Sequence, residues 1–258
     1  MAVAIGQNRS RFVAFAAVFS ALVAVLDAIP ILPMLYSGVW DSWVFLISPI
    51  VGVLLGPVIG AVCAGLGSLM GHFIFFRGPF EFLFMLGAPM GAAMAGLIYQ
   101  QRWRPALIIY SGLLLAYFLT PVAWVLPLWG IWDTLGAYVL LLLFALSIAK
   151  EWWPTLDTRF RLLRLSLCSV IGLEADILFR IFILVPGQTY WVFYGWTPAQ
   201  LQVIWLAAGV ITPLKVALAA LVTIMLGFSL LRLLPKLGIP PADALPARSG
   251  ASEAHMCH

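Results

Sequence analysis

The chain has 258 residues, of which 64% are hydrophobic and only 9% are charged. An ordinary soluble domain carries roughly 25% charged residues, and so few charged side chains cannot cover the surface of a soluble fold of this length. The composition excludes soluble enzymes and nucleic-acid-binding proteins, and it predicts a polytopic membrane protein. We therefore read the net charge of +4 as a sign of membrane topology rather than of affinity for an anion.

Proline, glycine and arginine divide the chain into apolar segments of about the length that a transmembrane helix needs, which is about 20 residues. The sequence thus predicts an all-α integral membrane protein, a bundle of about eight transmembrane helices. Only Gly56-Pro57 separates the second segment from the third, so one long kinked helix is the alternative there. The expected spans are 12–29, 43–56, 57–76, 81–100, 105–126, 134–150, 163–186 and 201–232.

Residues 1–234 are expected to form a single membrane domain. Arg9 and Arg11 precede the first apolar run as they would in a secretory signal, but Asp27 stands where the small residues of a cleavage site should lie. We therefore expect a retained helix. Residues 235–258 are rich in proline and small or polar residues, and this composition predicts a disordered cytoplasmic tail.

The positions of the basic residues predict the orientation of the bundle. With the N-terminus in the cytoplasm, eleven of the 14 lysines and arginines fall on the cytoplasmic side of an eight-span arrangement, and only Arg77 falls outside. Cytoplasmic loops carry such an excess of Lys and Arg. We expect a multi-pass protein of the cell (cytoplasmic) membrane with both termini in the cytoplasm.

Small residues recur at helical spacing in several spans. The pairs Gly67/Gly71 and Gly87/Gly91 predict close approach of helix backbones. The first span carries two such rows, Ala17/Ala21 and Ala16/Ser20/Ala24/Ala28. Internal packing needs only one smooth face, so the second row is a candidate interface for another membrane protein.

Ionisable side chains inside spans are costly unless they are paired or hydrated, which makes each a functional candidate. The seventh span holds Glu174, Asp176 and Arg180, and the eighth holds Lys215 at a depth similar to that of Glu174. Asp176 and Arg180 share a helix face because they are four residues apart. Two structural ion pairs, Asp176 with Arg180 and Glu174 with Lys215, are the alternative to a binding site.

Other polar residues are expected at the same depth in the outer half of the bundle. Asp27 ends the first span, His72 lies late in the third, and Arg77 and Glu81 flank the next turn. A satisfied buried histidine and a helix-capping Glu81 are the plainer readings. A cavity with mixed charges would suit a small polar or zwitterionic molecule. The candidate substrate-binding residues are Asp27, His72, Glu81, Glu174, Asp176, Arg180 and Lys215.

The sequence has no phosphate-binding loop, no HExxH and no GxSxG motif, so neither ATP hydrolysis nor protease or serine-hydrolase chemistry is predicted. The three cysteines, Cys63, Cys168 and Cys257, have no metal-binding spacing. We expect no catalytic residue, no cofactor and no metal.

Residues 12–100 resemble the substrate-binding S components of energy-coupling factor (ECF) transporters. The resemblance rests on Ala17 and Ala21 in the first helix, on a Phe-rich helix that follows the polar turn, and on the glycine pattern Leu55-Gly56-Pro57, Gly60, Gly65, Gly67, Gly71, Gly87, Gly91 and Gly96. It implies a vitamin or micronutrient uptake subunit that binds its ligand near the outer face, under the loop of about Ile31 to Ser42. It also implies that Ala17 and Ala21 dock on a transmembrane coupling protein driven by ATPase subunits.

S components usually have about six helices, whereas this sequence predicts about eight, so the resemblance does not extend past residue 105. The expected function is substrate capture for an ECF-type importer, with a small-molecule substrate, coupling and ATPase subunits and the lipid bilayer as partners and no nucleic acid. The alternatives are an ion-coupled secondary transporter that uses Glu174 and Lys215, and a membrane scaffold or assembly protein.

Overall fold

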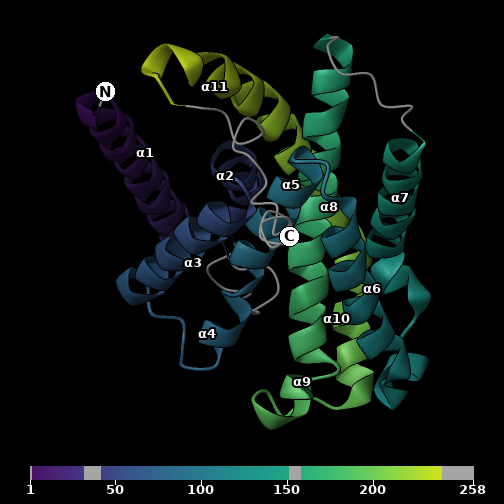
Figure 1. Cartoon of the computed structure of the whole chain (residues 1–258). Helices are drawn as coiled ribbons and strands as arrows, with labels where there is room; N and C mark the ends of the chain where they lie inside the picture. The colour runs from purple at the N-terminus through teal and green to yellow at the C-terminus, as the bar shows by residue number, and fades with distance from the viewer. Residues whose placement is uncertain (1, 32–41, 151–157, 240–258) are drawn as a thin grey trace, which may run out of the picture.

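The computed structural model describes residues 2–31, 42–150 and 158–239 (Figure 1). All regular elements in these ranges are helical, and one isolated bridge joins Pro30 to Ser42. The α-helices are α1 (Ala2–Ala28), α2 (Ser48–Leu55), α3 (Pro57–Ile74), α4 (Glu81–Phe84), α5 (Gly87–Tyr99), α6 (Trp103–Leu119), α7 (Trp132–Ala149), α8 (Thr158–Leu184), α9 (Thr189–Val192), α10 (Pro198–Val222) and α11 (Phe228–Leu233). The 3-10 turns are η1 (Trp43–Leu46), η2 (Pro121–Val125), η3 (Leu128–Ile131) and η5 (Pro235–Leu237), and η4 (Thr223–Gly227) is a π-helical turn.

The described helices are those of an all-α membrane protein. Five stretches are long and apolar enough to cross a bilayer, and α6 is a shorter apolar helix. The start of α1 lies at the same end of the molecule as α11, and α4 and α9 lie at the opposite end (Figure 1). The five stretches are Ser10–Ala28, Pro57–Ile74, Glu81–Tyr99, Leu128–Ala149 and Pro198–Leu237.

The second expected span, 43–56, is not a membrane-crossing helix. It consists of η1 and the eight-residue α2, which rises only about 12 Å, less than half of the hydrocarbon thickness. Every residue of α2 is buried, so its apolar side chains contact protein rather than lipid. Gly56 ends α2 with a φ of 81°, and Pro57 begins α3, so the Gly56-Pro57 joint is a turn between two helices and not a kink.

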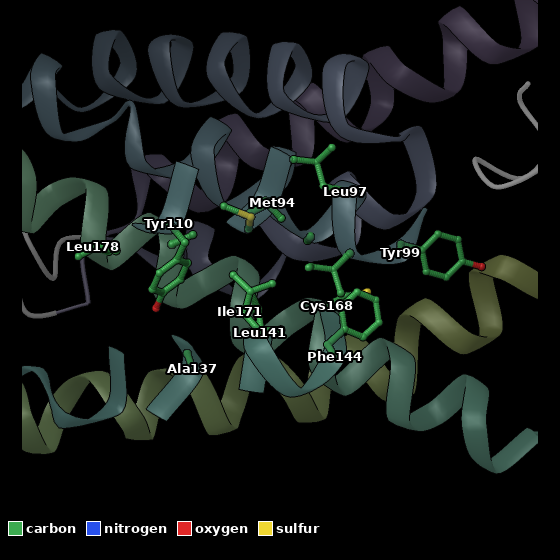
Figure 2. Close-up of a cluster of buried hydrophobic side chains, with 14 of the residues drawn as sticks. Met94, Leu97, Tyr99, Tyr110, Ala137, Leu141, Phe144, Cys168, Ile171 and Leu178 are labelled. Atoms are coloured by element: carbon green, nitrogen blue, oxygen red, sulfur yellow. The ribbon is translucent and has the colours of Figure 1, made fainter. Parts of the chain in front are cut away.

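Helix α8 lies inside the bundle, where α5, α6, α7 and α10 pack around it. Buried side chains of α2, α5, α6, α7 and α8 form one apolar cluster, which includes Met94 and Leu97 of α5, Leu141 of α7 and Ile171 of α8 (Figure 2). Although α8 has 27 residues, it is not among the five apolar stretches. Its charged residues Glu174, Asp176 and Arg180 are accommodated because they are buried against neighbouring helices.

The glycine rows bring helix backbones close together, as the sequence predicts. A Cβ atom at Gly67 would lie 2.6 Å from the Ser20 carbonyl oxygen of α1, and one at Gly91 would lie 3.1 Å from the Gly172 carbonyl oxygen of α8. The row Ser20/Ala24 therefore packs against α3, whereas α5 packs against α8. The prediction of close helix packing at Gly67/Gly71 and Gly87/Gly91 is confirmed.

The beginning of the expected disordered tail is folded. Residues 235–237 form η5, and Leu234 and Ile239 are buried in a cluster that includes Phe19 and Val23 of α1. Leu234 and Ile239 thus pack against apolar side chains of α1. The folded part of the chain therefore continues to residue 239. Residues 240–258 lie outside the described residues, as do residues 32–41 of the loop after the first helix.

Candidate functional site

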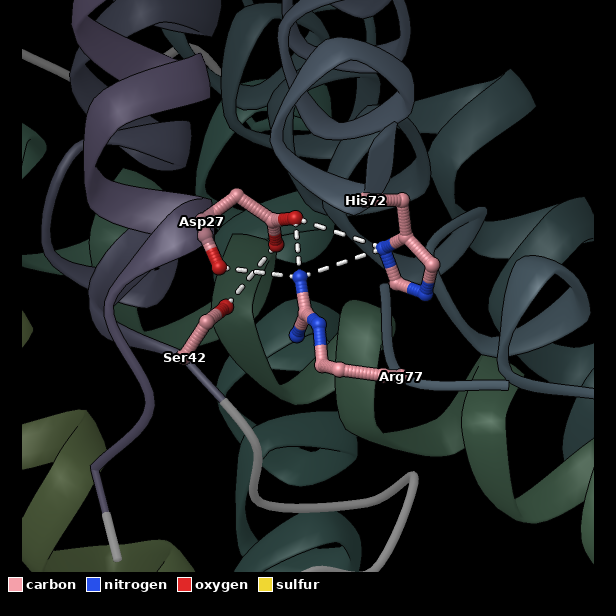
Figure 3. A network of polar contacts seen from close by, with 4 residues as sticks. All are labelled: Asp27, Ser42, His72 and Arg77. Atoms are coloured by element: carbon pink, nitrogen blue, oxygen red, sulfur yellow. Dashed lines mark hydrogen bonds and ion pairs between the residues drawn. The ribbon is translucent and has the colours of Figure 1, made fainter. Parts of the chain in front are cut away.

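A buried network at one end of the bundle joins Asp27 of α1, Ser42, His72 of α3 and Arg77 (Figure 3). The Arg77 guanidinium forms an ion pair with the Asp27 carboxylate and donates a hydrogen bond of 2.9 Å to the Asp27 carbonyl oxygen. The Ser42 hydroxyl donates to the other carboxylate oxygen of Asp27 at 2.9 Å. The network ties the C-terminal end of α1 to α3 and to both flanks of segment 32–41.

His72 is fully buried in this network, and its Nδ1 lies 3.1 Å from Arg77 Nη2 and 3.3 Å from Asp27 Oδ2. Nδ1 can accept from Arg77 or donate to Asp27, depending on the ring tautomer. Within the described part of the chain, Nε2 has no hydrogen-bond partner. The site therefore contains a buried ring nitrogen that a polar ligand atom could satisfy.

The short helix α4 connects this network to a second group of side chains. Phe82 packs against the His72 ring with a centroid distance of 5.0 Å, and Glu81 accepts a 2.6 Å hydrogen bond from the Tyr194 hydroxyl. Tyr194 stacks on Trp196 at 4.4 Å. Glu81 thus has a partner on the segment after α9, and it is more than a helix-capping residue.

Asp176 and Arg180 of α8 form the expected ion pair, with a distance of 2.6 Å between Oδ1 and Nε. Both residues are buried, and they lie against Gly87, where an added Cβ atom would lie 2.6 Å from Arg180 Nε. Because Gly87 follows α4 closely, this pair lies near Glu81. We call the following residues together the polar end: Asp27, Ser42, His72, Arg77, Glu81, Asp176, Arg180 and Tyr194.

Glu174 belongs to a different cluster and does not pair with Lys215. Its carboxylate accepts a 2.9 Å hydrogen bond from the Thr134 hydroxyl, whereas Lys215 Nζ lies 4.9 Å from the centre of the Phe45 ring. Of the two ion pairs that the sequence offered as the alternative to a binding site, the Glu174–Lys215 pair does not form among the described residues. Six residues, or about 1.7 turns, separate Glu174 from Arg180 on α8, and the two side chains point to different neighbours.

Asp133 is a buried carboxyl group that the sequence analysis missed. Its carboxylate accepts hydrogen bonds from the Thr134 backbone N–H at 2.9 Å and from the Thr212 hydroxyl. Thr134 therefore joins the carboxyl groups of Asp133 and Glu174, and Tyr110 donates to the Thr134 carbonyl oxygen at 2.9 Å. An acidic residue in the first turn of a helix is common, so the sequence held no signal that Asp133 faces inward.

Ala17 and Ala21 lie on the exposed side of α1, together with Val18 and Leu22. The other small-residue row of α1 is turned inward, where Ser20 donates to the Cys63 carbonyl oxygen at 3.2 Å. The two smooth faces of α1 thus differ in their surroundings. One packs against α3, and the other faces away from the bundle.

Within residues 2–31, 42–150 and 158–239, no group of three or more His, Cys, Asp or Glu side chains is arranged to hold a metal ion. No model of a known protein family matches the chain, and neither does any curated protein or solved structure. The features of the described chain that point to a function are the polar end, the Asp133–Glu174 cluster and the exposed face of α1.

Proposed function

We propose that this protein is the membrane-embedded substrate-capture subunit of an ECF-type importer for a small vitamin or micronutrient, energised by separate coupling and ATPase subunits. The observation that supports it is the polar end, where α1, α3, α4, α8 and the segment after α9 contribute buried charged and polar groups. Buried ionisable groups in a membrane bundle are costly, and they mark substrate sites more often than they serve packing.

The chemistry of the polar end suits a small polar or zwitterionic ligand. Asp176 and Arg180 offer opposite charges that already face each other, so a zwitterion could exchange with their pairing without leaving a net buried charge. His72 offers a buried ring nitrogen without a partner among the described residues, and the stacked Tyr194 and Trp196 offer a flat aromatic surface nearby. In this proposal Asp27 and Arg77 hold the site together rather than contact the ligand.

In this proposal both termini lie in the cytoplasm, which puts the polar end at the outer face of the membrane. The arrangement in Figure 1 supports this orientation, since α11, which carries Arg232 and is followed by Lys236, lies with the start of α1 at the end opposite α4 and α9. Cytoplasmic ends of membrane helices carry such positive charge. Ligand capture would then occur from outside the cell.

Mass spectrometry of the protein purified gently from its own membranes tests the proposal. We expect one small metabolite, released on denaturation in stoichiometric amount, together with a membrane coupling protein and ATPase subunits. Protein that carries neither a metabolite nor these subunits would contradict it.

The exposed face of α1 gives a more specific prediction. Ala17→Trp and Ala21→Trp are expected to abolish co-purification of the coupling protein, because each places a large ring on the smooth surface that docks. The bound metabolite should be retained, since both residues face away from the polar end. The matched control is Ala207→Trp on α10, where an equally exposed alanine is replaced. Unchanged co-purification of the α1 variants would remove the docking proposal.

A second candidate function, an ion-coupled secondary transporter, is favoured by the Asp133–Glu174 cluster. Two buried carboxyl groups that share Thr134 can bind a proton or another cation. The partner of Glu174 in this relay is then Asp133 and not Lys215. Helices α6, α7, α8 and α10 all contribute to this cluster. An ion bound here would therefore affect the packing of four helices.

Under this second function, the purified chain alone should transport the metabolite into liposomes when a pH gradient is imposed. Glu174→Gln is expected to reduce that transport at least about tenfold, because the amide cannot exchange a proton. The measurement is uptake of the radiolabelled metabolite with and without the gradient. Equal uptake in both conditions, or wild-type uptake by the variant, would exclude ion coupling through Glu174.

A further inference from the structure

A groove of about 480 Å³ lies between α1 and the C-terminal turn η5, at the end of the molecule opposite α4 (Figure 1). Helix α1 contributes Arg11, Phe15 and Val18, and the C-terminal segment contributes Lys236 and Leu237. The groove shares no residue with the polar end or with the Asp133–Glu174 cluster, and Val18 at its wall also lies beside Ala17 and Ala21 on the exposed face of α1. The groove is therefore distinct from the two buried polar clusters.

The mouth of the groove is cationic. Arg11 and Lys236 are both exposed, and the Arg11 guanidinium is positioned by a hydrogen bond of 3.4 Å from Nη1 to the Leu237 carbonyl oxygen. Among the described residues, no acidic side chain lines the groove. Two positive charges without a carboxylate between them attract an anion, and a guanidinium binds phosphate oxygens with two parallel hydrogen bonds.

The wall of the groove is apolar. Arg11, Phe15 and Val18 are spaced at four and three residues, so they follow one face of α1. From Arg11 to Val18 the helix rises about 10 Å, and Val18 is 64% exposed. The groove therefore has a positive mouth and an apolar wall that continues along the helix, which is the chemistry of an amphiphile with an anionic head.

The depth of the two cations also fits a lipid. Arg11 lies at the start of the apolar stretch Ser10–Ala28, and Lys236 lies at the end of the stretch Pro198–Leu237. Charged side chains at the ends of membrane helices lie at the level of the lipid headgroups. Basic pockets between helices at this level bind anionic headgroups. From this position and chemistry, we propose that the groove between α1 and η5 binds an anionic phospholipid, with its phosphodiester between Arg11 and Lys236 and an acyl chain along Phe15 and Val18.

Native mass spectrometry of the full chain tests this proposal, after delipidation in mild detergent. The probes are phosphatidylglycerol and phosphatidylcholine with the same acyl chains. We expect the protein to retain phosphatidylglycerol in preference to phosphatidylcholine. The double variant Arg11→Ala/Lys236→Ala should bind phosphatidylglycerol at least about tenfold more weakly, because it removes both positive charges at the mouth of the groove.

The matched control is Arg102→Ala/Arg104→Ala, which removes the same charge from two exposed arginines at the N-terminus of α6. This control should bind phosphatidylglycerol as the wild type does. An equal loss in both double variants would show that net charge alone attracts the lipid, and equal retention of the two lipids would show no headgroup selection. Displacement of phosphatidylglycerol by the same concentration of inorganic phosphate would identify a free-anion site. Each of these three results would overturn the proposal.

Discussion

Arg77→Ala is expected to lower the free energy of unfolding by about 3–5 kcal/mol, because it leaves the carboxylate of Asp27 buried without its cation. The side chains of Arg77 and Asp27 are only 1% and 4% exposed, so water cannot replace the lost guanidinium. Of the remaining neighbours, the Ser42 hydroxyl still donates to the carboxylate but carries no charge that could replace the guanidinium. Thermal or denaturant unfolding of the purified protein in detergent measures the effect.

Two further variants separate the loss of charge pairing from the loss of packing. Arg77→Lys keeps the positive charge and should cost less than Arg77→Ala. The double variant Asp27→Ala/Arg77→Ala removes both charges, and it should also be more stable than Arg77→Ala alone, since no unpaired carboxylate is left. A loss below about 1 kcal/mol for Arg77→Ala, or a double variant less stable than the single one, would contradict a tightly coupled buried pair.

Gly52→Ala is expected to cost about 3 kcal/mol, although it adds a single methyl group. A Cβ atom at Gly52 of α2 would collide with the carbonyl group of Ala92 on α5, and it would lie 2.7 Å from the Ala92 carbonyl carbon. The obstacle is backbone, so no side-chain rotation can relieve it, and the two helices must separate. The same unfolding measurement in detergent reports the loss.

The control for this prediction is Gly112→Ala on α6, where no atom lies within 4 Å of the added Cβ atom. The chemical change is identical, and alanine is the better helix former by about 1 kcal/mol, so this variant should be as stable as the wild type or more stable. If both glycine variants lost similar stability, the close contact between α2 and α5 would not be what requires glycine at position 52.

The predictions from sequence succeeded where a single residue type decides the local structure. Gly56-Pro57 indicated a break, and the positive φ of Gly56 followed by Pro57 at the start of α3 explains why the helix cannot continue. The ion pair of Asp176 with Arg180 was also predictable, because a spacing of four residues on a helix brings two side chains to one face.

The predictions from sequence failed where contacts between distant segments determine what surrounds a helix or a side chain. The apolar composition of α2 is that of a lipid-exposed helix, and only its burial among α3, α5 and α8 shows that its partners are protein. Glu174 and Lys215 lie at similar depth in sequence, but depth does not specify the direction in which each helix turns its side chains. Glu174 meets Thr134 of α7 for this reason, and Asp133 enters the same cluster.

The polar end was predictable in part. Asp27, His72, Glu81, Asp176 and Arg180 were expected near one face of the membrane, and the structure brings them together around α4. Tyr194 and Ser42 were not singled out as site residues. A hydroxyl group in an aromatic-rich or polar connecting segment carries no pattern of its own, so only the folded chain reveals that it binds a buried carboxylate.

The π-helical turn η4 makes the length of the C-terminal segment important as well as its composition. Thr223 at its start donates to Ser169 of α8 at 3.1 Å, which anchors the turn in the bundle. A π turn contains one residue more than an α-helical turn, whereas the deletion of one residue in the regular helix α11 that follows would rotate everything after it by about 100°. Lys236 and Leu237 would then turn away from α1. Substitutions between η4 and η5 should accordingly be tolerated far better than insertions or deletions. The number of residues in this stretch determines whether η5 contacts α1.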